Sequence, residues 1–118
     1  MLLRLDPASD APLFAQVAAS VRADAAAGRV KPGDRLPSAR DVAAALGVNL
    51  HTVLRAYQEL RDEGLVDMRR GRGAVVTDAA APLAHLRDDV IALTERARAL
   101  GLSPDMLAAL VKETARDR

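Results

Sequence analysis

Five side chains able to contact nucleic acid gather in one short stretch of this 118-residue chain: Asn49, His51, Thr52, Arg55 and Gln58. Their groups are short or planar hydrogen-bond donors and acceptors, which suit base edges and phosphates in a major groove. The apolar residues between them recur every three or four positions, so a helix ending near residue 63 would turn these groups outward together. This helix alone does not distinguish a DNA-reading face from an ordinary solvated face.

A second candidate is the arginine-rich segment Arg69-Arg70-Gly71-Arg72-Gly73. It lies between two short apolar runs, residues 65–68 and 74–77, which we expect to pair as a β-hairpin. Three arginines on a glycine-containing tip repel one another and gain nothing from a core. They suit a polyphosphate, and so slim a loop can enter a minor groove. A solvated basic turn is the alternative interpretation.

The sequence assembles no catalytic centre. The acidic pairs Asp62–Glu63 and Asp88–Asp89 are sequence neighbours, which point about 100° apart on a helix and do not converge on one substrate. The G-R-G run is too short for a phosphate-binding loop and does not open a helix. The chain has no cysteine, which excludes disulfides and thiolate metal sites. We therefore expect no enzyme activity, no metal site and no cofactor.

Two short helices joined by a tight turn position the first group of side chains. Ser38 occupies an N-cap position with Asp41 three residues later as its capping partner, and Gly47 ends this helix. Asn49 is the N-cap candidate of the next helix, which Gly64 terminates. A turn of about three residues containing glycine is typical of a helix-turn-helix. The buried faces of the two helices are predicted as Val42, Ala43 and Leu46, and as Val53, Ala56, Tyr57 and Leu60.

An amphipathic helix precedes this unit and is expected to cover it. Pro12 is predicted at the first helical position, and the helix ends at Gly28. Leu36, in the linker that follows, is expected to add a third strand to the hairpin. The predicted apolar stripe comprises Phe14, Val17, Ala18, Val21 and Ala25, and the preceding Leu2, Leu3 and Leu5 are expected to be extended.

Three runs of sequence resemble a known family. They are K-P-G-D-R-L-P-S-A-R-D-V-A-A-A-L-G-V-N, T-V-x-R-A-Y-x-x-L-x-x-E-G-L-V and R-R-G-R-G-x-V-V. They are similar to the winged helix-turn-helix of the GntR family of bacterial transcription regulators, over roughly residues 12–77. The T-V-x-R-A-Y variant and the short tail make the chain most similar to the YtrA subfamily, whose members carry only a small helical dimerisation segment.

The resemblance implies roles for individual residues. Arg40 corresponds to a phosphate or base contact of relatives, and Ser38 at the same helix start joins the candidate set. The start of the recognition helix, which reads bases in relatives, corresponds to Asn49, His51 and Thr52. The wing tip that enters the minor groove corresponds to Gly71, Arg72 and Gly73, beside Arg70.

Two positions depart from the family pattern. Leu50 and Leu54 stand where many relatives have arginine. Arg55 is one position later, about 100° around the helix, and cannot replace the missing arginine. The operator sequence of relatives therefore cannot be transferred to this chain, and Leu50 is expected to contact a thymine methyl group.

The tail is expected to be a dimerisation segment that follows a hinge at residues 78–82. Apolar residues recur there at steps of three and four up to Gly101, and Ser103 with Pro104 then begins a second helix. Two helices of this size cannot bury so long a seam by themselves, which favours a homodimer; the alternative is that the tail folds back on its own winged domain. The predicted interface comprises Leu83, Leu86, Val90, Leu93, Ala97 and Leu100 in the first helix and Met106, Leu107, Leu110 and Val111 in the second.

The predicted fold is mainly α with a small β-hairpin wing (α+β). A winged helix-turn-helix DNA-binding domain spans residues 1–78, and a two-helix dimerisation segment spans residues 79–118. The predicted function is a cytoplasmic transcriptional repressor that binds an inverted-repeat operator in double-stranded DNA as a homodimer. No apolar run approaches the ~20 residues of a membrane span. The alternative is a winged-helix adaptor for protein docking, which would not need the arginine tip, and the sequence leaves any small-molecule effector open.

Overall fold

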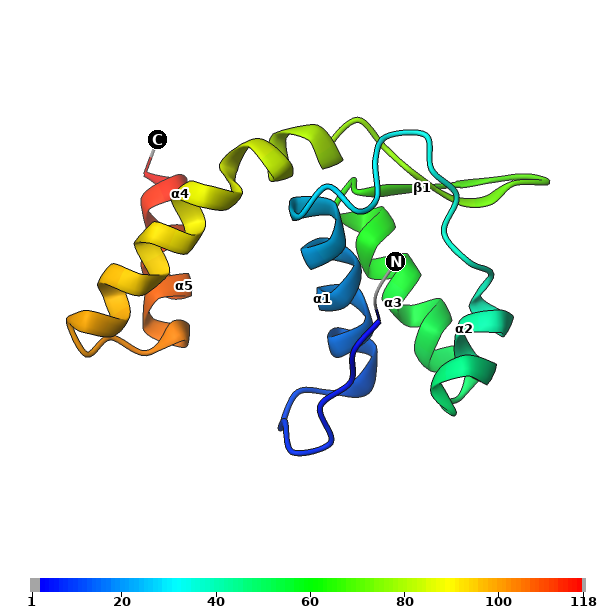
Figure 1. The fold of residues 1–118 in the computed structure, drawn as a ribbon, viewed down its shortest axis with the longest axis horizontal. Helices are drawn as coiled ribbons and strands as arrows, with labels where there is room; N and C mark the ends of the chain where they lie inside the picture. The colour runs from blue at the N-terminus through cyan, green and yellow to red at the C-terminus, as the bar shows by residue number, and fades with distance from the viewer. Residues whose placement is uncertain (1–2, 118) are drawn as a thin grey trace. The chain divides into compact units, whose positions relative to one another are not determined.

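The computed structural model describes residues 3–117, which form five helices and one β-hairpin (Figure 1). This mainly helical architecture with an antiparallel hairpin is the one predicted from the sequence. By internal packing the chain divides into two compact units, one up to His85 and one from Leu86 onward. None of the described helices is both long and apolar enough to cross a membrane. The elements are α1 (Leu13–Ala26), α2 (Ala39–Leu46), α3 (Leu50–Asp62), β1 (Val66–Arg69), β2 (Gly73–Val76), α4 (Ala80–Ala99) and α5 (Pro104–Arg116).

Helix α3 lies at the centre of the first unit and contacts α1, α2 and β1. The predicted apolar stripes of α1 and α3 are confirmed, because Val17, Val21, Val53 and Leu60 are fully buried. Phe14 and Leu46 are only partly buried, at the edge of this core. The position of α3 is therefore fixed on three sides, while its remaining side stays open.

The N-terminal segment is fastened along α1. The backbone N–H of Arg4 donates to Ser20 Oγ (3.2 Å), and the Ser20 hydroxyl donates to the Arg4 carbonyl (3.0 Å). Leu3 and Leu5 pack against the core, whereas Leu2 lies outside the described residues. Asp24, in the last turns of α1, is buried and accepts a hydrogen bond from Arg29 Nε (2.7 Å).

The hairpin is shorter at its tip than the sequence indicated. Arg69 pairs with Gly73 as the last residues of the two strands, so only residues 70–72 form the tip. Thr77 closes the base of the hairpin, because its hydroxyl donates to the Gly64 carbonyl (2.6 Å).

The predicted third strand at Leu36 is wrong. Arg35 forms a single antiparallel bridge with Val75, and no further ladder develops in the described chain. The pairing ends because the next residue that would face β2, Ser38, is already the N-cap of α2. The sheet therefore has two strands, with residues 33–36 laid along its edge by a few backbone hydrogen bonds.

Two predicted boundaries are also wrong. Pro12 is the N-cap of α1 rather than its first helical residue, because its ψ of 150° is extended. The expected hinge at residues 78–82 is largely helical, since α4 begins at Ala80, which is 2% exposed in the core of the first unit. Pro82 is tolerated there because it lies in the first turn of a helix. The compact units divide within α4, between His85 and Leu86, and a functional boundary after residue 78 stays a prediction.

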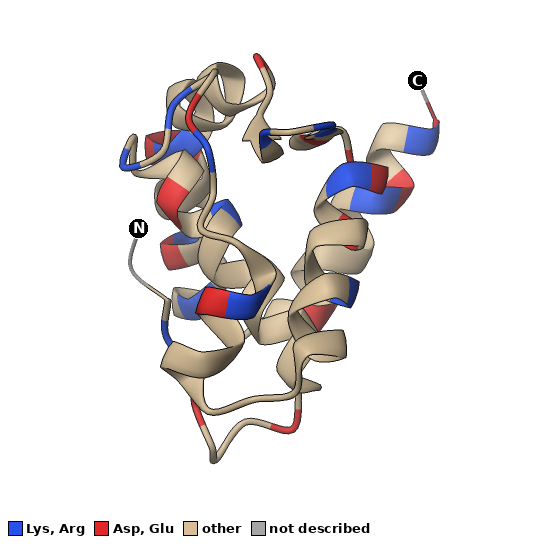
Figure 2. Cartoon of the chain, turned by 90° about the vertical axis from the view of Figure 1, so that its right-hand side faces the viewer, with Lys and Arg blue, Asp and Glu red and all other residues tan. Residues whose placement is uncertain are grey.

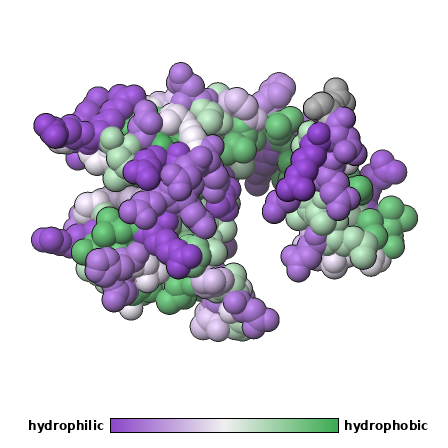
Figure 3. All heavy atoms as spheres, turned by 180° about the vertical axis from the view of Figure 1, so that it is seen from behind, coloured by the Kyte–Doolittle hydropathy of each residue, from purple (hydrophilic) through white to green (hydrophobic). Residues whose placement is uncertain are grey.

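The second unit is a helical hairpin with a small interior. Ser103 accepts a hydrogen bond from the Met106 N–H (3.1 Å) and caps α5, with Pro104 as the first helical residue, as predicted. Ala97 and Leu107 line a cavity of about 110 Å³ inside the hairpin. Much of the remaining apolar surface is open, and Figure 3 shows hydrophobic surface on this unit. The exposed residues are Leu86, Val90, Ile91, Leu93, Leu100, Met106, Leu110 and Val111.

Candidate nucleic-acid interface

The two helix starts of the helix-turn-helix use side chains that were also predicted to contact DNA. Ser38 Oγ accepts a hydrogen bond from the Asp41 N–H (3.1 Å), and Asn49 Oδ1 accepts one from the His51 N–H (2.8 Å). Each cap satisfies a helix donor that has no partner within the helix. Gly47, with φ of 67°, ends α2 in the left-handed conformation that glycine adopts without steric cost. Asn49 therefore has its amide NH₂ group left for a base or phosphate.

The open side of α3 carries some of the predicted side chains but not all of them. His51 and Gln58 are exposed, as is Arg40 on α2. Thr52 is half-buried, and Leu50 packs partly against the core. The structure thus gathers His51, Arg55 and Gln58 on one exposed face, while Leu50 has less freedom to reach a thymine methyl group than the sequence suggested.

Arg55 is held by an aromatic ring. Its guanidinium carbon lies 3.7 Å from the centroid of the Phe14 ring of α1. A cation stacked on an aromatic face is stabilised by the ring quadrupole and loses rotamer freedom. The stack links the start of α1 to the exposed face of α3 and leaves the edge of the guanidinium open.

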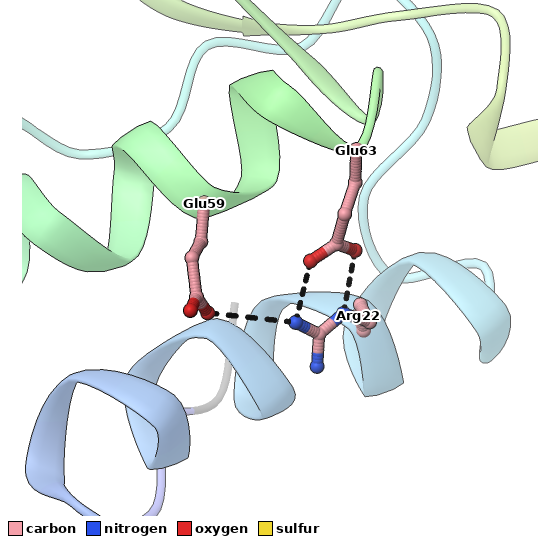
Figure 4. Close-up of polar contacts among 3 residues, drawn as sticks. All are labelled: Arg22, Glu59 and Glu63. Carbon is pink, nitrogen blue, oxygen red and sulfur yellow. Dashed lines mark hydrogen bonds and ion pairs between the residues drawn. The ribbon is translucent and has the colours of Figure 1, made fainter. Parts of the chain in front are cut away.

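A second link between α1 and α3 is electrostatic (Figure 4). Arg22 donates two hydrogen bonds of 2.7 Å to the Glu63 carboxylate, and Glu59 lies 4.0 Å from the same guanidinium. The hydrogen bonds from Arg22 lower the pKa of Glu63, and those to Glu63 raise the pKa of Arg22. Because Phe14 meets Arg55 and Arg22 meets Glu63, the two helices run in the same direction side by side.

Tyr57 ties α3 to the segment directly before α2. Its ring is buried, and its hydroxyl donates to the Pro37 carbonyl (2.7 Å). Burial raises the pKa of Tyr57 to about 12. This bond fixes the helix-turn-helix geometry directly before the Ser38 cap.

The wing tip is a glycine-containing turn with an arginine on either side of it. The Arg72 N–H donates to the Arg69 carbonyl (3.0 Å), which closes a β-turn whose third residue, Gly71, has φ of 78°. A β-turn of this kind needs a positive φ there, hence glycine. From outside the hairpin, Arg35 Nε donates to the Arg72 carbonyl (3.0 Å).

Charge at the tip is not neutralised by the protein. Arg69 lies 3.7 Å from Asp67, but Arg70 and Arg72 are exposed and make no ion pair within residues 3–117. Along the helices, by contrast, acidic and basic residues are interspersed (Figure 2). The chain carries a net charge of only +1, so the positive excess is local to the wing.

Three contacts at this interface were missed from the sequence: the Arg35 bond to the wing, the Tyr57 bond to Pro37 and the Phe14–Arg55 stack. Each joins segments that are far apart in the chain, so periodicity gives no sign of it. For Phe14 and Tyr57 a signal existed, because they are the only aromatic residues.

The described residues hold no cluster of three or more His, Cys, Asp or Glu side chains that could bind a metal ion. His85 has Asp88 and Asp89 three and four residues later on α4, but no such group forms around it.

Comparison with known proteins identifies the arrangement. The profile described as "Bacterial regulatory proteins, gntR family" matches residues 13–76. The HTH-type transcriptional repressor YtrA of Bacillus subtilis is 37% identical over 67% of this chain and 61% of its own length. The HTH-type transcriptional regulator Rv1152 of Mycobacterium tuberculosis is 40% identical over 86% of this chain and 84% of its own length.

Solved structures agree with these relatives. YtrA from Sulfolobus acidocaldarius, a GntR-family transcription factor, is 35% identical and superposes with a TM-score of 0.62 over 84% of this chain and 99% of that one. The DNA-binding domain of AraR in complex with operator ORX1 is 27% identical, with a TM-score of 0.56 over 64% of this chain and 93% of that one.

Proposed function

Because the chain belongs to the gntR family of bacterial regulatory proteins, we propose that it is a repressor that binds an inverted-repeat operator as a homodimer. The family consists of DNA-binding transcription regulators rather than enzymes. In the proposed complex the start of α3 enters the major groove and wing residues 70–72 enter the adjacent minor groove. The protein acts in the cytoplasm, and no small-molecule effector is part of the proposal.

The arginines of the wing tip are the main support for DNA binding. Arg22 and Arg29 are each paired with a carboxylate at 2.7 Å, as expected of structural arginines. The side chains of Arg70 and Arg72 have no such partner among the described residues and are exposed at the tip. Unneutralised arginines suit phosphates, because each contact releases counterions condensed on the DNA. The operator complex of the AraR domain supports the same partner for this chain.

Open apolar surface on the second unit supports the homodimer. Leu86, Val90 and Leu93 follow one another at steps of four and three and are 50%, 54% and 46% exposed. Met106 and Leu110 of α5 are also exposed. Such a run of apolar residues on a helix favours a partner helix over water. Two other predicted interface residues are occupied within the chain: Ala97 is buried in the hairpin and Leu83 packs against the first unit.

Two substitutions that introduce a charge, one on this surface and one beside it, test the homodimer. We expect Val90→Glu to give a monomer, because a carboxylate would be buried at the interface without a partner. Ala92→Glu is the matched control, since Ala92 is exposed on the same helix but lies well away around its axis. Sedimentation velocity measures both variants. Dimers with Val90→Glu, or monomers with wild-type protein, would contradict the proposed interface.

Operator binding is tested by selection from a randomised duplex library. The proposal predicts enriched sequences with two-fold symmetry, whose half-sites lie about one helical turn (~34 Å) or more apart. Gln58→Ala is expected to change the preferred bases within each half-site, whereas Arg87→Ala, an exposed change on α4, is expected to leave them unchanged. Enrichment of single, unsymmetrical sites would contradict binding as a dimer. No enrichment would contradict sequence-specific binding and favour the protein-docking alternative.

A further inference from the structure

Among the residues that the structure describes, Arg35 is the one arginine outside the wing whose side chain binds it. It lies in the linker between α1 and α2, 37 residues before Arg72, and its Nε donates to the Arg72 carbonyl. Its backbone pairs with Val75 of β2. The neighbouring Leu36 N–H donates to the Ala74 carbonyl (2.9 Å), so the linker runs along β2 toward the tip.

This contact constrains the part of the wing that carries the free charge. Without it, residues 70–72 would be held by the turn between Arg69 and Arg72 and by the strand pairing at its base. A two-stranded hairpin is marginally ordered by itself, and an arginine donor makes a stronger bond than a neutral one. The Nη groups of Arg35 make no hydrogen bond within residues 3–117, so their donors remain open next to the Arg72 backbone.

The same linker also holds the recognition helix. Pro37, two residues after Arg35, accepts the hydrogen bond from the Tyr57 hydroxyl of α3. Ser38 then caps α2. A segment of four residues, Arg35–Ser38, therefore contacts the wing tip, the recognition helix and the start of α2 in turn.

We infer that Arg35 is a positioning residue for the wing tip and a fourth cation of the wing, which contacts a DNA phosphate through its free Nη groups. The DNA part of this inference rests on the proposed function. The hydrogen bond from Arg35 Nε to the Arg72 carbonyl, called the brace below, exists in the free protein. In the complex, Arg35 holds the Arg72 carbonyl so that the Arg72 side chain starts from one position, and it meets the strand that flanks the minor groove.

The brace is tested without DNA by NMR on the full chain. In wild-type protein we expect slow solvent exchange of the Arg35 Nε–H. We also expect the ¹³C shift of the Arg72 carbonyl to change in Arg35→Gln but not in Lys31→Gln. Lys31 is the matched control because it is an exposed cation of the same linker and its side chain makes no hydrogen bond or ion pair within residues 3–117. Fast Nε–H exchange with an unchanged carbonyl shift would overturn the brace.

The DNA contact is tested by fluorescence anisotropy with a mixed-sequence duplex containing an A-tract, titrated over a range of salt concentrations. Arg35→Gln is expected to weaken binding by roughly tenfold and to lower the slope of log K against log salt by about 0.9, the loss of one phosphate contact. Lys31→Gln is expected to stay within about twofold, as an ordinary surface change does. Arg35→Lys keeps the charge and should keep the salt slope while the NMR signature of the brace weakens.

A double-mutant cycle separates the positioning role of Arg35 from the effect of its charge on DNA binding. In an Arg72→Ala background there is no Arg72 side chain to position, so Arg35→Gln should cost less than it does in wild-type protein. Equal costs in both backgrounds, or an unchanged salt slope in Arg35→Gln, would overturn the inference even if wild-type protein binds DNA well. Wild-type protein that binds no duplex at low salt would instead contradict the proposed function, and the NMR result would still decide the brace.

Discussion

Tyr57 gives the most direct test of how α3 is held in place. It is the only tyrosine of the chain, it is 3% exposed, and its hydroxyl donates to Pro37. Burial raises its pKa from 10.0 to about 12, because the phenolate would lose hydration. Ionisation would also remove the proton that binds the Pro37 carbonyl. Above its ordinary pKa, the folded state therefore resists ionisation.

The magnitude follows from linkage. The pKa is higher in the folded than in the unfolded chain, so the stability contribution is complete below pH 10.0 and is lost as pH rises toward about 12. A shift of this size corresponds to about 2–3 kcal/mol of unfolding free energy across that interval. Tyr57→Phe lacks the ionisable group and should lose this pH dependence. At neutral pH it should be less stable than wild type by ~1 kcal/mol through the missing hydrogen bond.

The assay is a spectrophotometric titration of the tyrosinate absorbance band, which reports one residue because the chain has a single tyrosine and no tryptophan. Native protein should titrate near pH 12, and protein in concentrated guanidinium chloride near the unperturbed value of about 10. Urea unfolding of wild type and Tyr57→Phe at neutral and alkaline pH measures the linked stability. A native titration near the unperturbed value, while circular dichroism shows the fold intact, would refute the buried, hydrogen-bonded Tyr57.

Three further predictions concern contacts around α3 and the wing. Glu63→Gln should destabilise the first unit by no more than ~1 kcal/mol, since the ion pair with Arg22 is partly exposed. Because the pKa of Glu63 is lowered in the folded state, this difference in stability should be present at neutral pH and vanish as pH falls through that pKa. Urea denaturation that shows the same difference in strong acid would argue against the ion pair. Phe14→Leu should weaken DNA binding by severalfold, because the stack of Arg55 on the Phe14 ring contributes ~0.5–1 kcal/mol to holding the guanidinium. In an Arg55→Gln background the same change should have little effect. Additive losses of affinity in a binding titration would exclude a coupling between Phe14 and Arg55. Gly71→Ala should strain the turn by ~1 kcal/mol, because residue 71 has a positive φ. Thermal stability should change little, whereas DNA affinity should fall clearly. Unchanged affinity would mean that DNA binding does not need this turn.

Local chemistry made most of the first unit predictable from the sequence. The Ser38 and Asn49 caps, the Gly47 stop and the apolar stripes of α1 and α3 each depend on residues within one or two helical turns. These features set the helix-turn-helix before any tertiary contact is considered. The arginine tip was also visible, because three cations within four residues have no use in a core.

Contacts between distant segments were not predictable in the same way. The expected hinge at residues 78–82 is mostly helix because Ala80 is small enough to be buried against the first unit, a packing effect absent from local composition. Leu36 adds no third strand because the chain leaves the sheet edge at Ser38 to begin α2, and the Ser38 cap was visible in the sequence. Ala97 fitted the seam by spacing, but the hairpin interior encloses it. For the candidate site, the open face of α3 was predicted, whereas the brace from Arg35 and the stack on Phe14 required the tertiary structure.

Sequence-specific binding of operator DNA is measured most directly by fluorescence anisotropy with the DNA immediately upstream of the gene that encodes this chain. A shuffled fragment of equal composition is the control, and Arg72→Ala is titrated in parallel at about 0.15 M salt. We expect a preference of at least ~10³ for the native fragment and clear weakening in Arg72→Ala. Equal binding of both fragments by wild type and variant alike, or no binding even at low salt, would contradict sequence-specific binding of operator DNA.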